Sequence, residues 1–283
     1  MTALVDVLIP TYNRAAALAV TLTSLAYQSF KDFRLVISDQ SDSGDAIQAG
    51  EVQAAIHVLR LRGHEIAIHK HLPPRGMAEQ RQFLLDQSTS PYSLFLDDDL
   101  ILEPYVIANM LAAIQEERCG FTGMAVIGLS YLDDVRPGEQ RIEWFDGPVR
   151  PEIVRFGTPQ WERYRLHNAA NLFHIAQRLN LTPDRQRTYR VAWVGGCVLY
   201  DTGKLRSVGG FSFWKELPRK HCGEDVLAQL RVMRRYGGCG LIPSGVYHQE
   251  LPTTLPDRNV DAPKVLDLIP PDQPLSERST LFK

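Results

Sequence analysis

The sequence predicts an α/β fold in which helices cover a sheet that contains parallel strands. In the first half of the chain, short apolar runs alternate with segments whose apolar residues recur at helical spacing. The composition, with 44% hydrophobic and 23% charged residues, is typical of a soluble globular protein. The 283 residues could form two average domains, but α/β enzymes of this length often form one.

The first strand is expected over residues 4–9, and a helix over residues 14–28 follows it, with Leu18, Leu22 and Leu25 at helical spacing. Further strands are expected over residues 33–39, 64–71, 92–96 and 121–129, and further helices over 46–61, 77–86 and 104–117. Such alternation is typical of a sheet whose strands run parallel and are joined by helices.

The second half of the chain has a different pattern. The regular alternation stops between residues 131 and 190, where residues 159–176 resemble an inserted helix among loops rich in Arg and Pro. A strand is expected over 191–201, and a helix that Gly237 ends follows the loop after it. Residues 1–128 and 129–250 are therefore expected to form two halves of one domain, and residues 251–283 a C-terminal tail that wraps the surface or pairs with a partner.

Charge and cysteine content exclude several classes of protein. Thirty-one basic and 33 acidic residues give a net charge of −2, whereas a nucleic-acid-binding domain is normally basic, so no nucleic-acid partner is expected. No apolar run approaches the roughly 20 residues of a transmembrane segment, and the start of the chain lacks the basic region of a signal peptide. The four cysteines lack zinc-site spacing, and we expect a cytoplasmic protein with reduced thiols.

An acidic cluster, Asp97-Asp98-Asp99, directly follows the strand expected over residues 92–96. Neither common glycine-rich phosphate loop is present, which argues against a Rossmann dehydrogenase and a P-loop enzyme. Hard cations such as Mg²⁺ and Mn²⁺ bind few carboxylates together with phosphate oxygens, so the cluster indicates a metal site. Strand alternation would put Asp97 and Asp99 on one face and Asp98 on the other. A solvated acidic loop or a helix cap remains an alternative.

Two further features carry possible chemistry. Glu224 and Asp225 open the helix that ends at Gly237, and His248 follows a strand-like run. Acids in a first helical turn also stabilise the helix dipole without any catalytic role. A single histidine is often only a structural residue.

In combination, these motifs resemble the GT-A glycosyltransferases of family 2. The resemblance covers about residues 4–250 and rests on the order V-L-I-P-T-Y-N-R, V-I-S-D, G-M-A-E-Q-R, F-L-D-D-D, G-G-F near G-E-D, and then a His. It implies a GT-A fold, with a Rossmann-like mixed central sheet flanked by helices and an inserted acceptor-side segment. Residues 1–128 would bind the nucleotide sugar, and residues 129–250 would bind the acceptor and carry out catalysis.

The resemblance also implies a nucleotide site. Pro10, Thr11, Tyr12 and Asp39 would contact the base, Arg14 and the pair Arg75 and Arg81 would supply positive charge, and Asp97 would lie near the ribose beside Asp98. The segment after Asp39, Gln40-Ser41, departs from the family pattern and leaves the identity of the base open.

The remaining implied residues belong to the metal site, the acceptor site and the catalytic base. Asp99 and His248 would hold a divalent metal, Mn²⁺ or Mg²⁺. The general base would be Asp225, with Glu224 as the alternative. Trp193, Gly195, Gly196 and Trp214 would line the acceptor side, although either tryptophan would equally suit a packed core.

The sequence therefore predicts an inverting, metal-dependent glycosyltransferase. It would move a sugar from a nucleoside-diphosphate sugar, with UDP favoured over GDP and dTDP, to a hydroxyl acceptor such as a saccharide, glycolipid or small molecule. A sugar nucleotidyltransferase is the first alternative, although the glycine-rich loop typical of that class is absent. The second alternative is a non-catalytic nucleotide-sugar-binding protein. Homo-oligomerisation, and peripheral membrane association with a lipid-linked acceptor, stay open.

Overall fold

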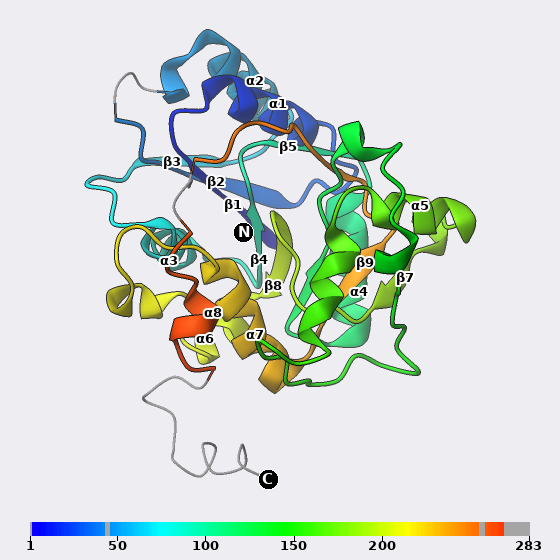
Figure 1. Ribbon diagram of the computed structural model, residues 1–283. Helices are drawn as coiled ribbons and strands as arrows, with labels where there is room; N and C mark the ends of the chain where they lie inside the picture. The colour runs from blue at the N-terminus through cyan, green and yellow to red at the C-terminus, as the bar shows by residue number, and fades with distance from the viewer. Residues whose placement is uncertain (1, 43–45, 255–257, 269–283) are drawn as a thin grey trace.

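An eight-stranded mixed sheet forms the centre of the molecule (Figure 1). The computed structural model describes residues 2–42, 46–254 and 258–268. Across the sheet the strand order is β3-β2-β1-β4-β8-β6-β9-β7. The strands of this sheet are β1 (Val5–Thr11), β2 (Phe33–Asp39), β3 (Ile66–Lys70), β4 (Tyr92–Leu96), β6 (Phe121–Gly123), β7 (Arg187–Tyr189), β8 (Cys197–Asp201) and β9 (Gly238–Ile242). A separate antiparallel pair joins β5 (Leu100–Leu102) to β10 (Val246–His248).

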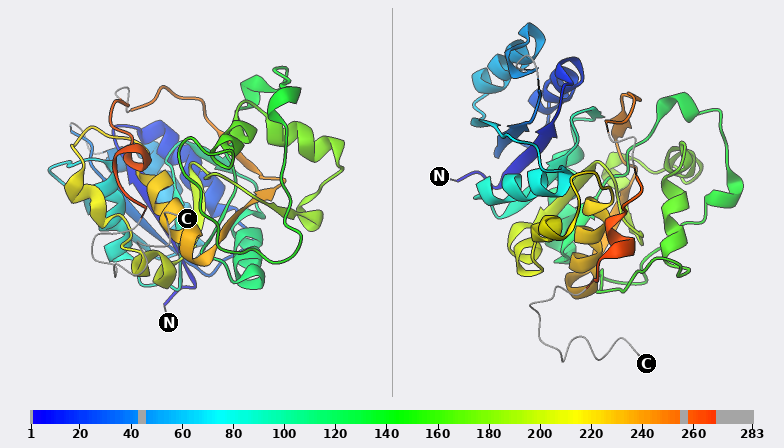
Figure 2. Two further views of the ribbon diagram at one scale, coloured as in Figure 1. Left: turned by 60° about the horizontal axis from the view of Figure 1, so that its bottom comes forward. Right: turned by 60° about the vertical axis from the view of Figure 1, so that its left-hand side comes forward.

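Helices cover both faces of the sheet (Figures 1 and 2). They are α1 (Ala15–Ala26), α2 (Gly50–Leu61), α3 (Met77–Gln87), α4 (Val106–Glu117), α5 (Asn171–Arg178), α6 (Thr202–Ser207), α7 (Glu224–Tyr236) and α8 (Ala262–Val265). Alternate residues of β1 enter two hydrophobic cores, because successive side chains of a strand point to opposite faces. Val7 packs with apolar residues of α1, α2 and α4, whereas Leu8 packs with those of α3, α6 and α7.

The direction of the strands brings polar turn residues to one edge of the sheet. β1 pairs in parallel with both β2 and β4, so the carboxyl ends of these three strands lie side by side. β8 runs antiparallel between β4 and β6, and β6 is parallel to β9. The loop after β1 and the acidic turn after β4 therefore meet at the same edge, as open α/β sheets commonly arrange their binding residues.

The predicted alternation in the first half is confirmed. The strands over residues 33–39 and 92–96 have the predicted bounds, and the other predicted helices and strands of this half are present with shifted ends. The strand expected over 121–129 ends at Gly123, and the short strand β5 was not predicted. Gly237 ends α7 with a φ of +72°, in the left-handed region that favours glycine at this position.

The second half departs further from the predicted elements. The strand expected over 191–201 begins only at Cys197, because Gly196 turns the backbone with a φ of +76°. Before it, the side chain of Gln229 pairs with both backbone polar groups of Val194, in place of a neighbouring strand. The inserted helix expected over 159–176 is a 3₁₀ segment over Trp161–His167 followed by α5, with Ala169 at a φ of +48° between them. Helix α6 was not predicted.

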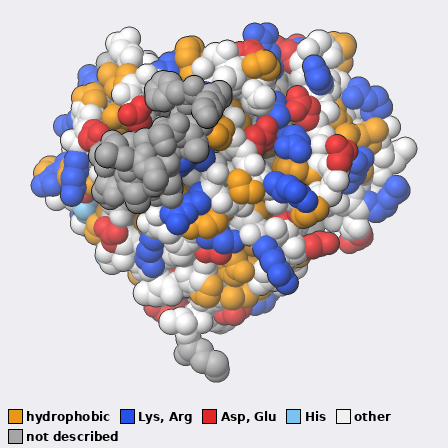
Figure 3. Space-filling model, turned by 90° about the horizontal axis from the view of Figure 1, so that it is seen from below, with side chains coloured by type: hydrophobic (Ala, Val, Ile, Leu, Met, Phe, Trp, Pro, Cys, Tyr) orange, Lys and Arg blue, Asp and Glu red, His pale blue; other side chains and the backbone are white. Residues whose placement is uncertain are grey.

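The described part of the C-terminal segment lies across the start of α7. The Ala262 N–H donates to the Cys222 carbonyl oxygen, the Cys222 N–H donates to that of Val260, and α8 packs against α7 (Figure 2). The prediction of a tail over residues 251–283 extends beyond the described residues. On the face shown in Figure 3, basic, acidic and apolar side chains are interspersed outside the grey region. None of the helices in the described ranges has the length and apolarity needed to cross a bilayer.

Candidate active site

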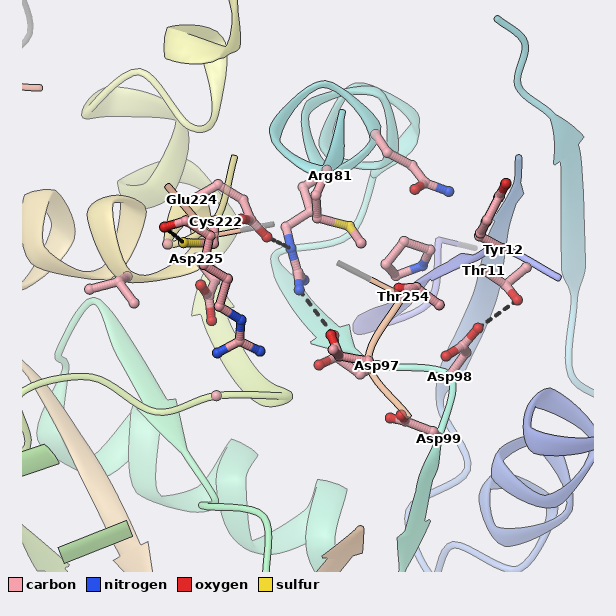
Figure 4. Close-up of a pocket in the computed structure, with 18 of the residues that line it drawn as sticks. Thr11, Tyr12, Arg81, Asp97, Asp98, Asp99, Cys222, Glu224, Asp225 and Thr254 are labelled. Atoms are coloured by element: carbon pink, nitrogen blue, oxygen red, sulfur yellow. Dashed lines mark hydrogen bonds and ion pairs between the residues drawn. The ribbon is translucent and has the colours of Figure 1, made fainter. Parts of the chain in front are cut away.

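A cavity of about 700 Å³ lies where the loops after β1 and β4 meet the start of α7 (Figure 4). Its volume is in the range of small-molecule sites. It brings together thirteen of the residues that the sequence predicted for the site: Pro10, Thr11, Tyr12, Arg14, Arg81, Asp97, Asp98, Asp99, Trp193, Gly195, Glu224, Asp225 and His248.

The acidic turn after β4 places all three of its carboxylates on this cavity (Figure 4). The strand alternation expected for them does not apply, since β4 ends at Leu96 and the backbone turns. The Asp98 carboxylate accepts a hydrogen bond from the Thr11 hydroxyl at 2.7 Å. Burial, with a smaller contribution from the neighbouring Asp99, raises the pKa of Asp98 to about 6 despite that hydrogen bond.

Asp99 has two basic neighbours and stays ionised. Its carboxylate contacts the Arg14 guanidinium and lies 3.5 Å from Nε2 of His248. Burial alone would raise the pKa of Asp99, but the hydrogen bonds with His248 and Arg14 hold it below its ordinary value. The same guanidinium also contacts the carbonyl oxygen of Pro252, so Arg14 joins the acidic turn to the C-terminal segment.

The hydrogen bonds of His248 determine which of its nitrogens carries the proton. Its Nδ1 accepts the backbone N–H of Glu250 at 2.8 Å, so the neutral ring carries its proton on Nε2, toward Asp99. The bond to Asp99 raises the pKa of His248. A metal-binding histidine normally uses one nitrogen for the metal and donates the proton of the other to a neighbouring acceptor. In His248, Nδ1 instead accepts the Glu250 N–H and Nε2 carries the proton toward Asp99, so neither nitrogen has a lone pair open to a metal in this conformation.

A divalent cation therefore suits Asp99 better than His248 in the conformation described. Nowhere in the described ranges do three His, Cys, Asp or Glu side chains form a ready-made metal cluster. The Asp99 carboxylate lines the cavity and is a hard oxygen ligand of the kind that Mg²⁺ and Mn²⁺ prefer. Water and phosphate oxygens of a substrate would have to supply most other ligands, as is usual for Mg²⁺.

A buried ion-pair network connects the acidic turn to the start of α7. Arg81 of α3 donates from Nε to Glu224 Oε1 at 3.0 Å and from Nη2 to Asp97 Oδ1 at 3.0 Å (Figure 4). The Arg81 side chain is only 7% exposed. Burial opposes its charge, but Asp97, Glu224 and Asp225 together raise the pKa of Arg81. The guanidinium thus remains charged inside the protein.

Asp225 differs from its neighbour Glu224 in its partners. Both lie in the first turn of α7, where the helix dipole favours negative charge, so both can stabilise the helix as the non-catalytic alternative supposes. Glu224 is buried and paired with Arg81, whereas half-buried Asp225 forms no ion pair within the described ranges. Burial and the charge of Glu224 raise the pKa of Asp225 to about 7, although Arg81 opposes this rise. A carboxylate of this kind, in a cavity, is a candidate proton acceptor.

Four residues predicted for the site do not line the cavity. Buried Asp39 accepts hydrogen bonds from Lys70 at 2.8 Å and from the Ser41 N–H at 2.8 Å. Arg75 is exposed before α3. The carbonyl oxygen of Gly196 accepts a hydrogen bond from the Asp97 N–H, so Gly196 contacts the backbone of the acidic turn. Trp214 is half-buried against the hydrophobic core on the α7 side of the sheet.

The C-terminal segment supplies cavity residues that the sequence did not predict. They are Leu251, Thr253, Thr254, Arg258, Asp261 and Lys264; Met77, Gln80, Cys222, Gly223 and Val226 complete the lining. Lys264 pairs with Asp261 at 2.9 Å. Exposed Arg258 has no acidic partner among the described residues, so its charge is available to a ligand. No sequence pattern indicates this placement, because it depends on the chain returning across α7.

The mixed central sheet flanked by helices is that of a GT-A glycosyltransferase. The chain belongs to glycosyl transferase family 2, whose family model matches residues 6–178. The fold resembles S. aureus TarS 1–349, with 16% identity and a TM-score of 0.53 over 86% of this chain and 60% of that one. The same protein in complex with UDP-GlcNAc gives 17% identity and a TM-score of 0.51 over 89% of this chain and 60% of that one. A search of curated proteins found no match.

Asp225→Asn is expected to stabilise the protein at high pH. A carboxyl whose pKa is higher in the folded state binds more protons there than in the unfolded state, so stability falls as the pH rises from about 4 to about 7. The substitution removes this loss, and we expect a gain in unfolding free energy that is roughly 1–3 kcal/mol larger at pH 8.5 than at pH 5. Urea unfolding at both pH values measures it.

Glu224→Gln is the matched control for that measurement. It leaves Arg81 buried with one carboxylate fewer and should destabilise the protein at both pH values. A gain from Asp225→Asn that does not depend on pH would contradict the raised pKa of Asp225.

Proposed function

We propose that the protein is an inverting glycosyltransferase that moves a sugar from a nucleoside-diphosphate sugar to a hydroxyl acceptor. The observation that carries the proposal is that one cavity holds both the acidic turn after β4 and the carboxylate of Asp225, which has no ion pair among the described residues. A proton acceptor and a cation-binding carboxylate at opposite walls of one site are what attack by a hydroxyl on a sugar diphosphate requires.

The diphosphate of the donor would lie beside Arg14 and Asp99, with Arg258 reaching toward it from the segment that crosses the start of α7. Arg14 lies after β1 and reaches the acidic turn, and Arg258 enters from the C-terminal segment. Thr11 and Tyr12 would face the nucleoside. TarS shares this fold and is described in complex with UDP-GlcNAc, which makes UDP-sugars the first donors to test, with GDP- and dTDP-sugars as alternatives.

Asp225 would act as the general base, and Glu224 would not. The Glu224 carboxylate is committed to Arg81, whereas Asp225 forms no ion pair in the described part of the chain. A base is most effective when its pKa lies near the working pH, and the pKa of Asp225 is raised to about 7. Proton removal by one carboxylate and direct attack by the acceptor invert the anomeric centre.

A divalent cation held by Asp99 would neutralise charge that develops on the departing diphosphate. Arg14 and Arg258 would contribute to the same stabilisation from the protein side. The acceptor would lie near Trp193, whose indole lines the cavity and stacks on Tyr164 with ring centroids 5.5 Å apart. Aromatic faces of this kind pack against the apolar face of a sugar ring. All four cysteines are free, which suits a reducing cytoplasm.

Single-turnover transfer tests the catalytic assignment. With Mn²⁺ present, we expect the protein to hydrolyse, or to transfer from, one of a panel of UDP-, GDP- and dTDP-sugars. Asp225→Asn should keep donor binding and lose a factor on the order of 10²–10⁴ in rate, the usual contribution of a general base. Absence of turnover with every donor would contradict the proposed function. A fast Asp225→Asn beside an inactive Glu224→Gln would assign the base to Glu224.

Metal titration tests the roles of Asp99 and His248. We expect Asp99→Asn to raise the Mn²⁺ concentration for half-maximal activity by on the order of tenfold or more. His248→Gln keeps a side-chain N–H toward Asp99 and should change this concentration less than His248→Ala does. Equal losses in the two His248 variants would instead make the imidazole a metal ligand. Activity that a chelator leaves intact would exclude the metal.

A further inference from the structure

We propose that Arg81 is a positioning residue that locks the acid pair of α7 against the acidic turn, and that it does not bind the phosphates of the donor. The proposal rests on the proposed function, because it assigns how the catalytic carboxylates are held. It also differs from the role that the family resemblance implied for this residue, which was nucleotide binding.

The contacts of Arg81 span three elements that are far apart in the sequence. The residue belongs to α3, Asp97 follows β4, and Glu224 begins α7. Each carboxylate lies 3.0 Å from a different nitrogen of the guanidinium, and Figure 4 shows Arg81 between them. The Arg81 and Glu224 side chains are 7% and 6% exposed. A planar group with fixed donors thus sets the separation of the two acidic elements.

The same burial makes Arg81 a poor phosphate ligand. To reach a diphosphate, the guanidinium would have to leave two carboxylates, one of them buried beside a second acid. Charges left unpaired in the interior are strongly unfavourable. Arg258 lines the same cavity and has no acidic partner among the described residues. Arg14 also lines it; it is paired with Asp99, but its side chain is more exposed than that of Arg81 and it does not hold the acid pair of α7, so both are better placed to meet an anionic ligand.

A second contact fixes the helix that carries Arg81. The backbone N–H of Ala78, in the first turn of α3, donates to Nε2 of buried His221 at 3.1 Å. Nδ1 of His221 in turn donates to the Pro218 carbonyl oxygen at 2.7 Å. His221 lies three residues before Glu224, so α3 and the segment that leads into α7 are joined at two points. This leaves Arg81 little freedom to move.

Two consequences for Asp225 follow. Because Arg81 is ion-paired with Glu224, Asp225 is the carboxylate of the acid pair that can accept a proton. The positive charge of Arg81 also favours the ionised form of Asp225, against Glu224 on α7 and Asp97 after β4. The other titratable groups near the acid pair are Cys222 before α7, Tyr200 on β8 and Arg258, Asp261 and Lys264 of the C-terminal segment. Loss of Arg81 should therefore misplace Asp225 and raise its pKa.

The test compares Arg81→Gln with Arg14→Gln as the matched control. Arg81→Gln should lower kcat on the order of 10²-fold, as expected when a catalytic group is displaced, with the donor KM nearly unchanged. The acid limb of the kcat profile should move to higher pH, because the base must be deprotonated. Arg14→Gln should instead weaken binding of the nucleoside diphosphate, measured by calorimetry. Arg81→Lys should recover part of kcat.

Two further measurements keep the proposal falsifiable if Arg81→Gln folds poorly or if no donor is turned over. The double variant Arg81→Gln/Glu224→Gln removes both buried charges and should be more stable than Arg81→Gln alone. By carboxyl NMR, the pKa of Asp225 should be higher in the double variant than in Glu224→Gln, because only the double variant also lacks the charge of Arg81. Arg81→Lys keeps this charge and should leave the pKa near that of the parent.

The proposal is overturned if Arg81→Gln weakens nucleoside-diphosphate binding tenfold or more while the pH profile of kcat stays in place. It is equally overturned if the two buried charges show no coupling in the double variant. Lack of turnover by the parent protein with every donor would count against the proposed function alone, because the NMR and stability measurements do not depend on turnover.

Discussion

The arrangement of the site depends on one buried guanidinium. Arg81 pairs with Asp97, which is partly exposed, and with buried Glu224, whose neighbour on α7 is Asp225. Without Arg81, Glu224 would be left as a buried carboxylate with no cation beside it, next to the second acid Asp225. The contact between Arg81 and Glu224 depends on the position of α3, which a hydrogen bond to His221 fixes, and on the start of α7 at Glu224.

Four of the carboxylates that line the cavity have surroundings that give them different chemical properties. Asp99, beside His248 and Arg14, has a lowered pKa and remains an anion that suits a cation. Asp98, buried against the Thr11 hydroxyl, has a pKa raised to about 6. Asp225 has a pKa raised to about 7 and Glu224 is held by Arg81. Such divergent environments are how active sites divide acid, base and binding roles among identical groups.

Sequence patterns predict much of the fold and about half of the residues that line the cavity. Alternating strands and helices predict that β1 and β4 end at one edge, which brings Thr11 and Asp97–Asp99 together. Local patterns could not predict that Gly196 shortens β8 or that Ala169 interrupts the inserted helix. They also could not place Arg258 or choose the partners of Arg81, because these contacts join elements that are distant along the chain.

The most direct test of this account is a crystal structure with Mn²⁺ and the nucleoside diphosphate that binds most tightly. We expect Arg81 to keep both ion pairs, with Asp97 and Glu224, while the phosphates lie beside Asp99, Arg14 and Arg258, and Asp225 stays open to the acceptor side. A structure in which the Arg81 guanidinium has left Glu224 and binds a phosphate oxygen would contradict the account.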